Sequence, residues 1–588
     1  MSGGLYRSNH AADGYPRPEQ GVTVVSVDEQ SATASGDQAL PPENVPPASD
    51  DSGGKSTAGQ SAIMAIGSMV SRVIGFVRTA LLTMTLGGLV GNAYTNAQFL
   101  PNQIYELLLG GILSSVLIPL LVRRRKEDPD GGQAFTQRLL TFAVVSLGIA
   151  TVLVVVAAPL ITAIQSSDDA DPDSTRLVTQ LAYLILPIIF FTGLSGLIGA
   201  VLNVRGHFAA PTWAPILNNL VVIATCGVFI LAYGSSGELT PKNITATQIA
   251  LIGGGTLLGM VVQALGLLPA LRKVGFQFRW NWAPRSLGLR EIGQLAGWML
   301  CYAGANQLAV FLVVRVLTKT AGDNNPSTLV YNNVFLLIMM AHGIIGVSVM
   351  TALLPKMSAA AAEGRYDEVS ADLNRGIKLT SAALAPIVVI YAVLGAPIAV
   401  FLFQGARFTN ANALATGTVL TVAAFAVLPL SLSYLCTYAF YSLQGNKTVA
   451  LINLPVVAVR IGAYLVLAEV LKPALLAAGM TAANGISYLV SALISLAVLR
   501  RRIGRLNLGT VVSALIRVAI AAGIAAALGL LVLHFLPGSG APDGRVQALI
   551  QLIPTGAVIL ITYLAAAYLL RVREITQVVG MVRRKIGR

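Results

Sequence analysis

Long apolar segments recur along almost the whole chain of 588 residues, and each is long enough to cross a lipid bilayer as a helix. A membrane-spanning helix needs about 20 apolar residues. Only 11% of the residues are charged, against roughly 25% in soluble domains. Since the pattern lacks the short alternating strands of an outer-membrane barrel, it predicts an all-α polytopic membrane protein with about fourteen transmembrane helices. The predicted helices are 60–88, 92–122, 138–165, 177–203, 212–234, 246–271, 291–317, 329–355, 376–403, 411–442, 448–470, 474–499, 509–536 and 547–570.

The segment before the first apolar run, residues 1–57, is rich in Pro, Gly, Ser, Ala and Asp. This composition offers little to bury and predicts a disordered tail. The segment lacks the basic and then apolar pattern of a signal peptide, so we expect the first helix to remain in the mature protein. The other end, 571–588, is predicted to be a short basic tail.

The loop charges predict the orientation in the membrane, because Lys and Arg collect on the cytoplasmic side of short loops. Clusters of basic residues fall in 123–138, 272–290, 356–378 and 500–505, which all lie on one side of the predicted topology. Each loop on the opposite side holds a single basic residue. We therefore expect a multi-pass protein of the bacterial plasma (inner) membrane with both termini in the cytoplasm. The net charge of +14 follows from this orientation and requires no nucleic-acid partner.

Two sequence matches at nearly the same spacing predict an internal repeat. The segment GGILSSVLIPLL resembles GVSVMTALLPKM, with Pro119 aligned to Pro355, and LNVRGHF resembles YSLQGNK, with Gly206 aligned to Gly445. We predict two parallel six-helix lobes, followed by two extra transmembrane helices. Such repeats are typical of alternating-access transporters with the substrate site between the halves. The expected units are a tail at 1–57, an N-terminal lobe at 58–272, a C-terminal lobe at 290–500, helices 13 and 14 at 506–570 and a tail at 571–588.

Motifs of catalysis are missing from the sequence. It contains no P-loop GxxxxGK[ST] and no HExxH, and no nucleophile is paired with a base. The cysteines Cys226, Cys301 and Cys436 each lie within an apolar run without CxxC spacing, so we expect packing residues rather than a metal or redox site. The pattern indicates that the protein is not an enzyme and needs no metal or other cofactor.

Charged residues at membrane depth are costly and usually face a cavity or a partner. Arg72 and Arg78 lie in the first helix, roughly 15 Å and 24 Å from its inner end at 1.5 Å per residue. Arginine presents a planar fork that suits phosphate oxygens, so a cationic cavity for an anionic head group is one interpretation. Glu106 falls near the depth of Arg72, and an ion pair that only joins two helices is the alternative. Three further arginines lie at membrane depth: Arg315 and Arg517, which can reach an interface, and Arg460, a cavity candidate near mid-depth.

The chain resembles the MurJ/MviN family of lipid II flippases, within the multidrug/oligosaccharidyl-lipid/polysaccharide exporter superfamily. The resemblance rests on SRVIGFVR (71–78), LPN (100–102), VLIPLL (116–121), GIIGVSVMTALLPKMS (343–358) and YSLQGNKT (441–448). The form LPNxxxEL is similar to the actinobacterial branch. The resemblance implies that Ser71, Arg72, Arg78 and Asn102 line a central cavity and meet the substrate.

The chain also departs from the family pattern. Asn92 stands where an acid is expected near the start of the second helix, and Tyr105 and Glu106 stand where arginines are expected. A glutamate of the family is Gly110 here, and an Arg and a Glu of helix eight are replaced near Leu336 and Met339. Of the family's charged groups, only the first-helix arginines carry over, and Arg460 or Arg315 is expected to compensate.

The predicted function is the flipping of lipid II, or a similar undecaprenyl- or decaprenyl-diphosphate-linked muropeptide, to the outer leaflet by alternating access. Its predicted substrate-binding residues are Ser71, Arg72, Arg78, Asn102, Glu106 and Arg460. The expected partners are this lipid, membrane lipids, and cell-wall synthesis or division proteins. Three alternatives stay open: a flippase for another polyprenyl-linked glycan, a cation-coupled drug antiporter, and a non-transporting scaffold for cell-wall proteins.

Overall fold

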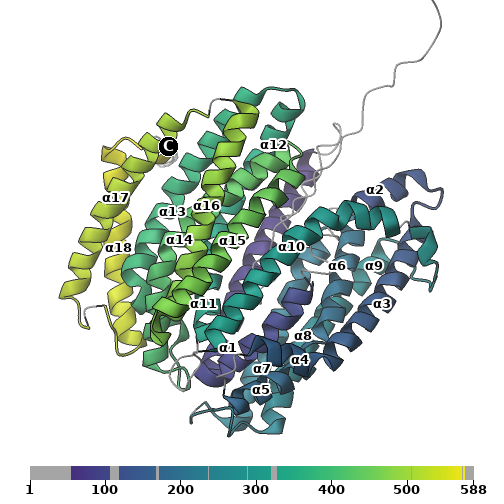
Figure 1. Ribbon diagram of the computed structural model, residues 1–588, viewed down its shortest axis with the longest axis horizontal. Helices are drawn as coiled ribbons and strands as arrows, with labels where there is room; N and C mark the ends of the chain where they lie inside the picture. The colour runs from purple at the N-terminus through teal and green to yellow at the C-terminus, as the bar shows by residue number, and fades with distance from the viewer. Residues whose placement is uncertain are drawn as a thin grey trace, which may run out of the picture.

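The computed structural model describes most of the chain, namely residues 54–105, 118–166, 171–235, 237–287, 289–319, 327–504, 506–538, 540–572 and 574–576. Every regular element in these ranges is a helix (Figure 1). Within them, thirteen helical segments are long and apolar enough to cross a membrane. The prediction of an all-α polytopic membrane protein is confirmed.

The helices follow the predicted segments closely. In chain order they are α1 (Gly54–Tyr105), α2 (Ile118–Glu127), α3 (Gln133–Val156), α4 (Ala158–Gln165), α5 (Pro172–Ile185), α6 (Ile188–Val204), α7 (Ala209–Tyr233), α8 (Ala246–Gly266), α9 (Leu268–Lys273), η3 (Pro284–Leu287), α10 (Leu289–Thr318), α11 (Ser327–Ala341), η4 (His342–Gly346), α12 (Val347–Ala362), α13 (Tyr366–Phe403), α14 (Asn410–Ser442), α15 (Asn446–Val470), η5 (Pro473–Leu475), α16 (Leu476–Ile503), α17 (Leu508–Phe535) and α18 (Arg545–Leu569).

Two features of the chain ends bear on the predicted tails. Helix α1 begins at Gly54, so the last residues of the predicted tail 1–57 are helical, and 1–53 lie outside the described residues. Of the predicted tail 571–588, only residues 571, 572 and 574–576 are described.

Proline divides three of the predicted helices. Pro159 lies in the first turn of α4, Pro187 is the residue before α6, and Pro269 lies in the first turn of α9. A proline has no backbone N–H and cannot continue the hydrogen bonding of a preceding helix, but it is accepted in a first turn. The segments 138–165, 177–203 and 246–271 are therefore each built from two helices.

A backbone break at Gly87 divides α1 into two arms. Gly87 has φ 73° and ψ −166°, which is outside the helical region. Arg78 before the break and Gln98 after it line the same cavity, whereas a straight helix would separate them by about 30 Å. The chain therefore folds back at Gly87, and the single span Met69–Phe99 joins the end of the predicted helix 60–88 to the beginning of the predicted helix 92–122.

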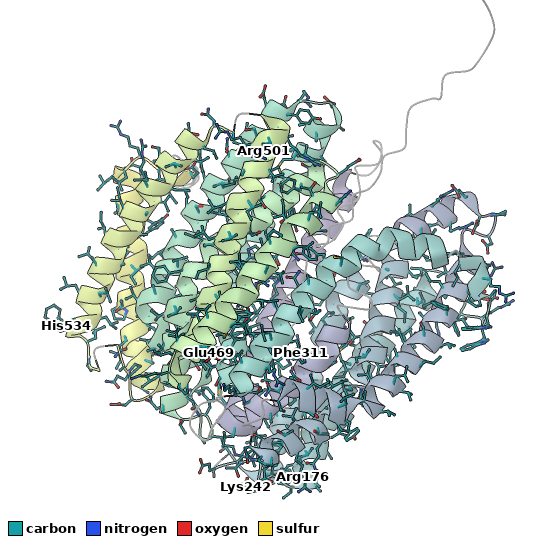
Figure 2. All side chains as sticks on the ribbon, viewed as in Figure 1. Arg176, Lys242, Phe311, Glu469, Arg501 and His534 are labelled. Carbon is teal, nitrogen blue, oxygen red and sulfur yellow. The ribbon has the colours of Figure 1, made fainter. Side chains whose placement is uncertain are left out.

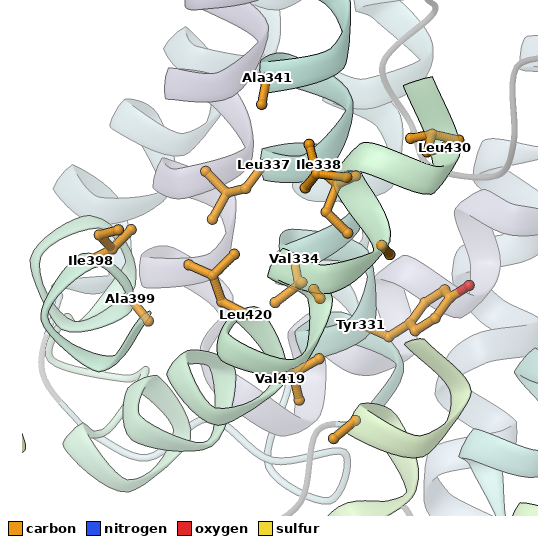
Figure 3. Close-up of a cluster of buried hydrophobic side chains, with 14 of the residues drawn as sticks. Tyr331, Val334, Leu337, Ile338, Ala341, Ile398, Ala399, Val419, Leu420 and Leu430 are labelled. Carbon is orange, nitrogen blue, oxygen red and sulfur yellow. The ribbon is translucent and has the colours of Figure 1, made fainter. Parts of the chain in front are cut away.

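The buried apolar side chains form separate clusters in the two parts of the chain. One set joins α1 to α9, which we call the N-terminal lobe, and the other joins α10 to α16, which we call the C-terminal lobe. Helices α17 and α18 pack against each other and against α13. Figure 3 shows part of the C-terminal core, where Val334 and Ile338 of α11 meet Leu420 of α14. Ala80 and Phe99 of α1 join this core, so α1 contacts both lobes.

The two ends of the bundle carry the loops that the charge pattern separates. Arg176 and Lys242 lie at one end in Figure 2, and Arg501 lies at the opposite end. We call the end with Arg176 and Lys242 the outer end and the other the inner end, after the predicted orientation.

Candidate functional site

Arg72 lies where α1 meets the C-terminal lobe. A Cβ atom added to Gly343 would overlap its guanidinium, so the missing side chain of this glycine makes room for the charge. Gly343 belongs to η4, a π-helical turn, and such turns are frequent at functional sites. The neighbouring His342 is buried, with its Nδ1 2.9 Å from Ser431 Oγ and its ring 4.9 Å from that of Tyr434.

Arg78 is also directed toward the C-terminal lobe, one and a half turns further along α1. Its side chain is only 5% exposed and lines a cavity between the two arms of α1 and α11. Polar groups surround it: Tyr94 and Gln98 lie on the second arm, and Asn332 lies on α11. The buried Oδ1 of Asn332 has no hydrogen-bond partner among the residues that the structure describes. This is the first of two cavities that contain an arginine.

The two arginines match positions on the facing helix. Leu336, which lines the Arg78 cavity, precedes Gly343 by seven residues, and Arg72 precedes Arg78 by six. Both separations correspond to about 10 Å along a helix. The two cations therefore differ in depth by about 10 Å along the seam between the lobes and lie on faces of α1 roughly 120° apart. The internal repeat predicts the substrate site at this seam.

The other residues predicted on the first two helices are described less completely. Ser71 is half-buried, and its carbonyl accepts a hydrogen bond from Asn219 Nδ2 of α7 at 3.4 Å. Asn102 lies in the second arm of α1, where the structure describes its backbone only. Glu106, and with it the predicted pair of Glu106 and Arg72, lies outside the described residues.

Arg460 lies inside the C-terminal lobe, apart from the seam. It is 5% exposed; its Nε donates to Ser487 Oγ at 3.0 Å and its Nη1 to Asn306 Oδ1 at 3.5 Å. Its guanidinium carbon also lies 5.2 Å from the centre of the Tyr488 ring. The side chain lines a second cavity between α10, α14, α15 and α16. The prediction groups Arg460 with the first-helix arginines, but the structure gives it a separate cavity.

A shared aromatic side chain connects the surroundings of these two sites. Tyr434 lines the cavity of Arg460, and its ring packs on His342, the residue before Gly343. The His342–Tyr434 pair therefore lies between the position of Arg72 and the second cavity.

Hydrogen bonds join the two lobes at their outer ends. Asn92 Oδ1 accepts from the backbone N–H groups of Thr328 and Leu329 at 2.9 and 3.0 Å, and so caps the first turn of α11. Thr83 and Asn333 exchange a hydrogen bond nearby. The sequence analysis treats Asn92 only as a departure from the family pattern, because an asparagine in an apolar run carries no signal of its partner.

Arg407, in the loop between α13 and α14, makes a second link at the outer end. Its Nη1 donates to the carbonyl of Thr85 at 3.0 Å and its Nε to the carbonyl of Gly237 at 3.2 Å. Burial lowers the pKa of Arg407, although an arginine stays charged at any physiological pH. Its backbone carbonyl is adjacent to Gly87, where a Cβ would come within 2.7 Å. The structure is therefore closed at the outer end.

Arg315 contributes a third outer link, between α10 and α4. Its Nη1 donates to the carbonyls of Ile164 and Ser166, and Thr318 Oγ1 donates to that of Gln165 at 3.2 Å. The arginine thus reaches the outer end of its helix, as predicted, and binds carbonyls there.

Solved structures with this architecture are membrane transporters. A structure of lipid II flippase MurJ in an inward closed conformation aligns with a TM-score of 0.68, covering 90% of this chain and all of that one at 16% identity. An inward-facing multidrug resistance MATE transporter of the MOP superfamily aligns with a TM-score of 0.62, covering 76% of this chain and 99% of that one at 17% identity. This chain shares the fold of these two proteins.

The sequence itself gives the family. The family model for lipid II flippase MurJ matches residues 83–544. A probable lipid II flippase MurJ of Bdellovibrio bacteriovorus is 26% identical over 523 residues, covering 88% of this chain and 95% of its own. The lipid II flippase MurJ of Burkholderia cenocepacia is 24% identical over 446 residues, with 74% and 82% coverage. This chain belongs to the MurJ lipid II flippase family, and the resemblance inferred from its motifs is confirmed.

Proposed function

We propose that this protein flips lipid II, a polyprenyl-diphosphate-linked muropeptide, from the cytoplasmic to the outer leaflet by alternating access. Membership of the family and the shared transporter fold support this proposal. The observation that carries it is the position of Arg72 and Arg78, two cations on one helix that are both directed across the seam between the lobes.

The chemistry of the two arginines suits a diphosphate. Each guanidinium offers up to five N–H donors in a fixed fork, and two of them can balance the charge of two phosphate groups. The head group enters from the inner end while the outer links of Asn92 and Arg407 hold the lobes together. Reorientation of the lobes then breaks these links and exposes the head group on the other side, while the polyprenyl tail stays in lipid.

The membrane potential favours the return step in this scheme. The loaded site carries no large net charge, because the diphosphate offsets both arginines. Without the diphosphate the site is more positive by two charges, and an inside-negative potential favours the inward transfer of positive charge by roughly 2.3 kcal/mol per charge per 100 mV of the field it crosses. The same charges disfavour a drug antiporter, because two arginines beside the seam repel a cationic drug.

The proposed orientation places both termini in the cytoplasm and the protein in the bacterial plasma membrane. This orientation rests on the basic clusters of the inner loops, such as Arg123, Arg124 and Arg125. The outer loops hold at most one Lys or Arg each. A cysteine scan of one inner and one outer loop in intact cells tests it independently of transport.

The proposal is tested by binding to the purified protein in nanodiscs. We expect wild type to bind lipid II more tightly than undecaprenyl phosphate, which lacks the second phosphate and the head group. The double variant Arg72→Gln, Arg78→Gln is expected to lose this preference, whereas Arg517→Gln on the exposed side of α17 keeps it. Equal binding of another polyprenyl-diphosphate glycan would assign the protein a different substrate, and no binding of either would refute the proposal.

A further inference from the structure

The second cavity, inside the C-terminal lobe, has a chemistry of its own. Its wall combines four phenol rings with amides and hydroxyls. Apart from Arg460 its lining includes Tyr302, Asn306, Tyr434, Tyr441, Asn453 and Tyr488. The lining residues of α14 and the first turns of α15 lie near the inner ends of these helices, so the cavity occupies the inner half of the lobe.

Arg460 is a buried cation with neutral partners. Its hydrogen bonds go to a hydroxyl and an amide oxygen, and its ring contact is with a phenol. The spans that enclose the cavity, Cys301–Thr318, Asn410–Ser442, Lys447–Val470 and Pro473–Ile503, contain a single acidic residue, Glu469. Glu469 is nine residues from Arg460, about 13 Å along α15, at the outer end of the helix. Among the described residues no carboxylate pairs with this arginine, and a buried charge is costly unless it is paired, so the site favours an anionic ligand.

A second unsatisfied group in the same wall is also a donor. Asn453 Nδ2 is buried and has no hydrogen-bond partner within the part of the chain that the structure describes. Arg460 uses two of its five N–H groups on Ser487 and Asn306, so three are left for a ligand. Donors that lack acceptors, grouped around one positive charge, favour a ligand with negatively charged oxygens.

The charge of the cavity selects among such ligands. One arginine balances one negative charge, which matches a carboxylate, whereas a diphosphate would leave a surplus. The seam with Arg72 and Arg78 already supplies two cations for two phosphates. Through Tyr434 and His342 the second cavity adjoins the position of Arg72, so a single extended head group can occupy both.

We propose that the cavity around Arg460 and Asn453 is a carboxylate subsite, and that it binds a carboxylate of the peptide carried by the lipid-linked substrate. This inference rests on the proposed function, because it assigns the diphosphate to the seam and the peptide to the C-terminal lobe. In this arrangement the phenol rings of the cavity lie alongside the part of the substrate that links its diphosphate to its peptide carboxylate. Recognition of the peptide in this way distinguishes a muropeptide from a glycan without acidic substituents.

The test compares two substrates and two ways of removing the charge. The full-length protein in nanodiscs is titrated with lipid II, and with lipid II whose peptide carboxylates have been converted to amides. Arg460→Gln removes the cation. Asn306→Asp keeps the side-chain shape and supplies a carboxylate to the Nη1 that Asn306 already accepts from, so that the cation is neutralised within the protein. Arg460→Lys keeps the charge, and Arg517→Gln on α17 is the matched control.

We expect both neutralising variants to weaken binding of lipid II by roughly tenfold to a hundredfold, the loss of one charge-assisted contact. Binding of the amidated lipid is expected to be equally weak in wild type and in both variants. Arg460→Lys is expected to lie between wild type and Arg460→Gln, and Arg517→Gln to match wild type. Asn306→Asp keeps the test informative if Arg460→Gln does not fold, because it adds an ion pair instead of removing a buried group.

Other results would overturn the inference in distinguishable ways. If amidation has no effect and Asn306→Asp binds like wild type, the arginine is a structural charge. If acetate stabilises wild type but not Arg460→Gln in a melting experiment, while amidation of the lipid has no effect, the anion is a free carboxylate and not the substrate peptide. If wild type binds neither form of lipid II, and so binds no better than the double variant Arg72→Gln, Arg78→Gln, the proposed function itself fails.

Discussion

The contact between Gly343 and Arg72 leads to a prediction in which stability and function change in different directions. In Gly343→Ala the new methyl group would occupy the position of the Arg72 guanidinium. The guanidinium is the far end of a flexible side chain, so it can move aside while the backbone stays in place. Alanine within a helical segment is favoured over glycine by roughly 0.5–1 kcal/mol. We therefore expect the free energy of unfolding to change by no more than about 1 kcal/mol.

The displaced arginine is expected to lose its contact with the substrate diphosphate. A hydrogen bond to a charged group contributes roughly 1.5–3 kcal/mol, which corresponds to a tenfold to hundredfold weaker binding of lipid II. The assay pairs a melting curve with a lipid II titration on the same nanodisc sample. Gly523→Ala in α17 is the control, because a Cβ there meets no atom within 4 Å. Unchanged binding, or a loss of binding that only follows a loss of stability, would refute this role of Arg72.

The outer links give three further predictions. Asn92→Ala removes the cap of α11 and is expected to destabilise the outer-closed state by about 1 kcal/mol. The measurement is the rate at which maleimide labels a cysteine placed at Thr83, which is expected to rise. Asn92→Asp keeps the cap and is expected to be labelled as slowly as the parent. Arg407→Lys cannot donate to two carbonyls from a planar fork, so we expect the same faster labelling; a rate equal to the parent would remove Arg407 from the closure. In Gly87→Ala the alanine would have to adopt a positive φ, and its Cβ would collide with the backbone carbonyl of Arg407. We expect a lower melting temperature, equivalent to a loss of at least about 1–2 kcal/mol. An unchanged melting curve would show that the bend tolerates a side chain.

The sequence predicts the membrane helices well because apolar length is a strong and local signal. The predicted segment 212–234 is the helix Ala209–Tyr233, and 411–442 is Asn410–Ser442. The interruptions are harder to predict. Pro187 inside a long apolar run is compatible with either a kink or a break, and the π-helical turn at His342–Gly346 depends on how Arg72 and Ser431 pack around it.

The candidate site is predictable only in part, for a physical reason. Arg72 and Arg78 are recognisable because a charge at membrane depth is costly, and this identifies the seam. Depth along a helix can be counted from sequence, but the direction a side chain faces within the bundle cannot. The position of Arg460 near the middle of its helix is therefore predictable, whereas its contacts with Ser487 and Asn306 and its separate cavity are not. Uncharged groups such as Asn332 and Asn453 leave no signal, because similar residues occur in many of the helices.

Movement of lipid II across the membrane by way of Arg72 can be followed through the accessibility of lipid II on the outer face of cells depleted of the protein. The cells are rescued with wild type, with Arg72→Ala or with the control Arg517→Gln. We predict that outer-face lipid II falls on depletion, and that wild type and Arg517→Gln restore it while Arg72→Ala does not. Outer-face lipid II that is unchanged by depletion, or fully restored by Arg72→Ala, would contradict the account.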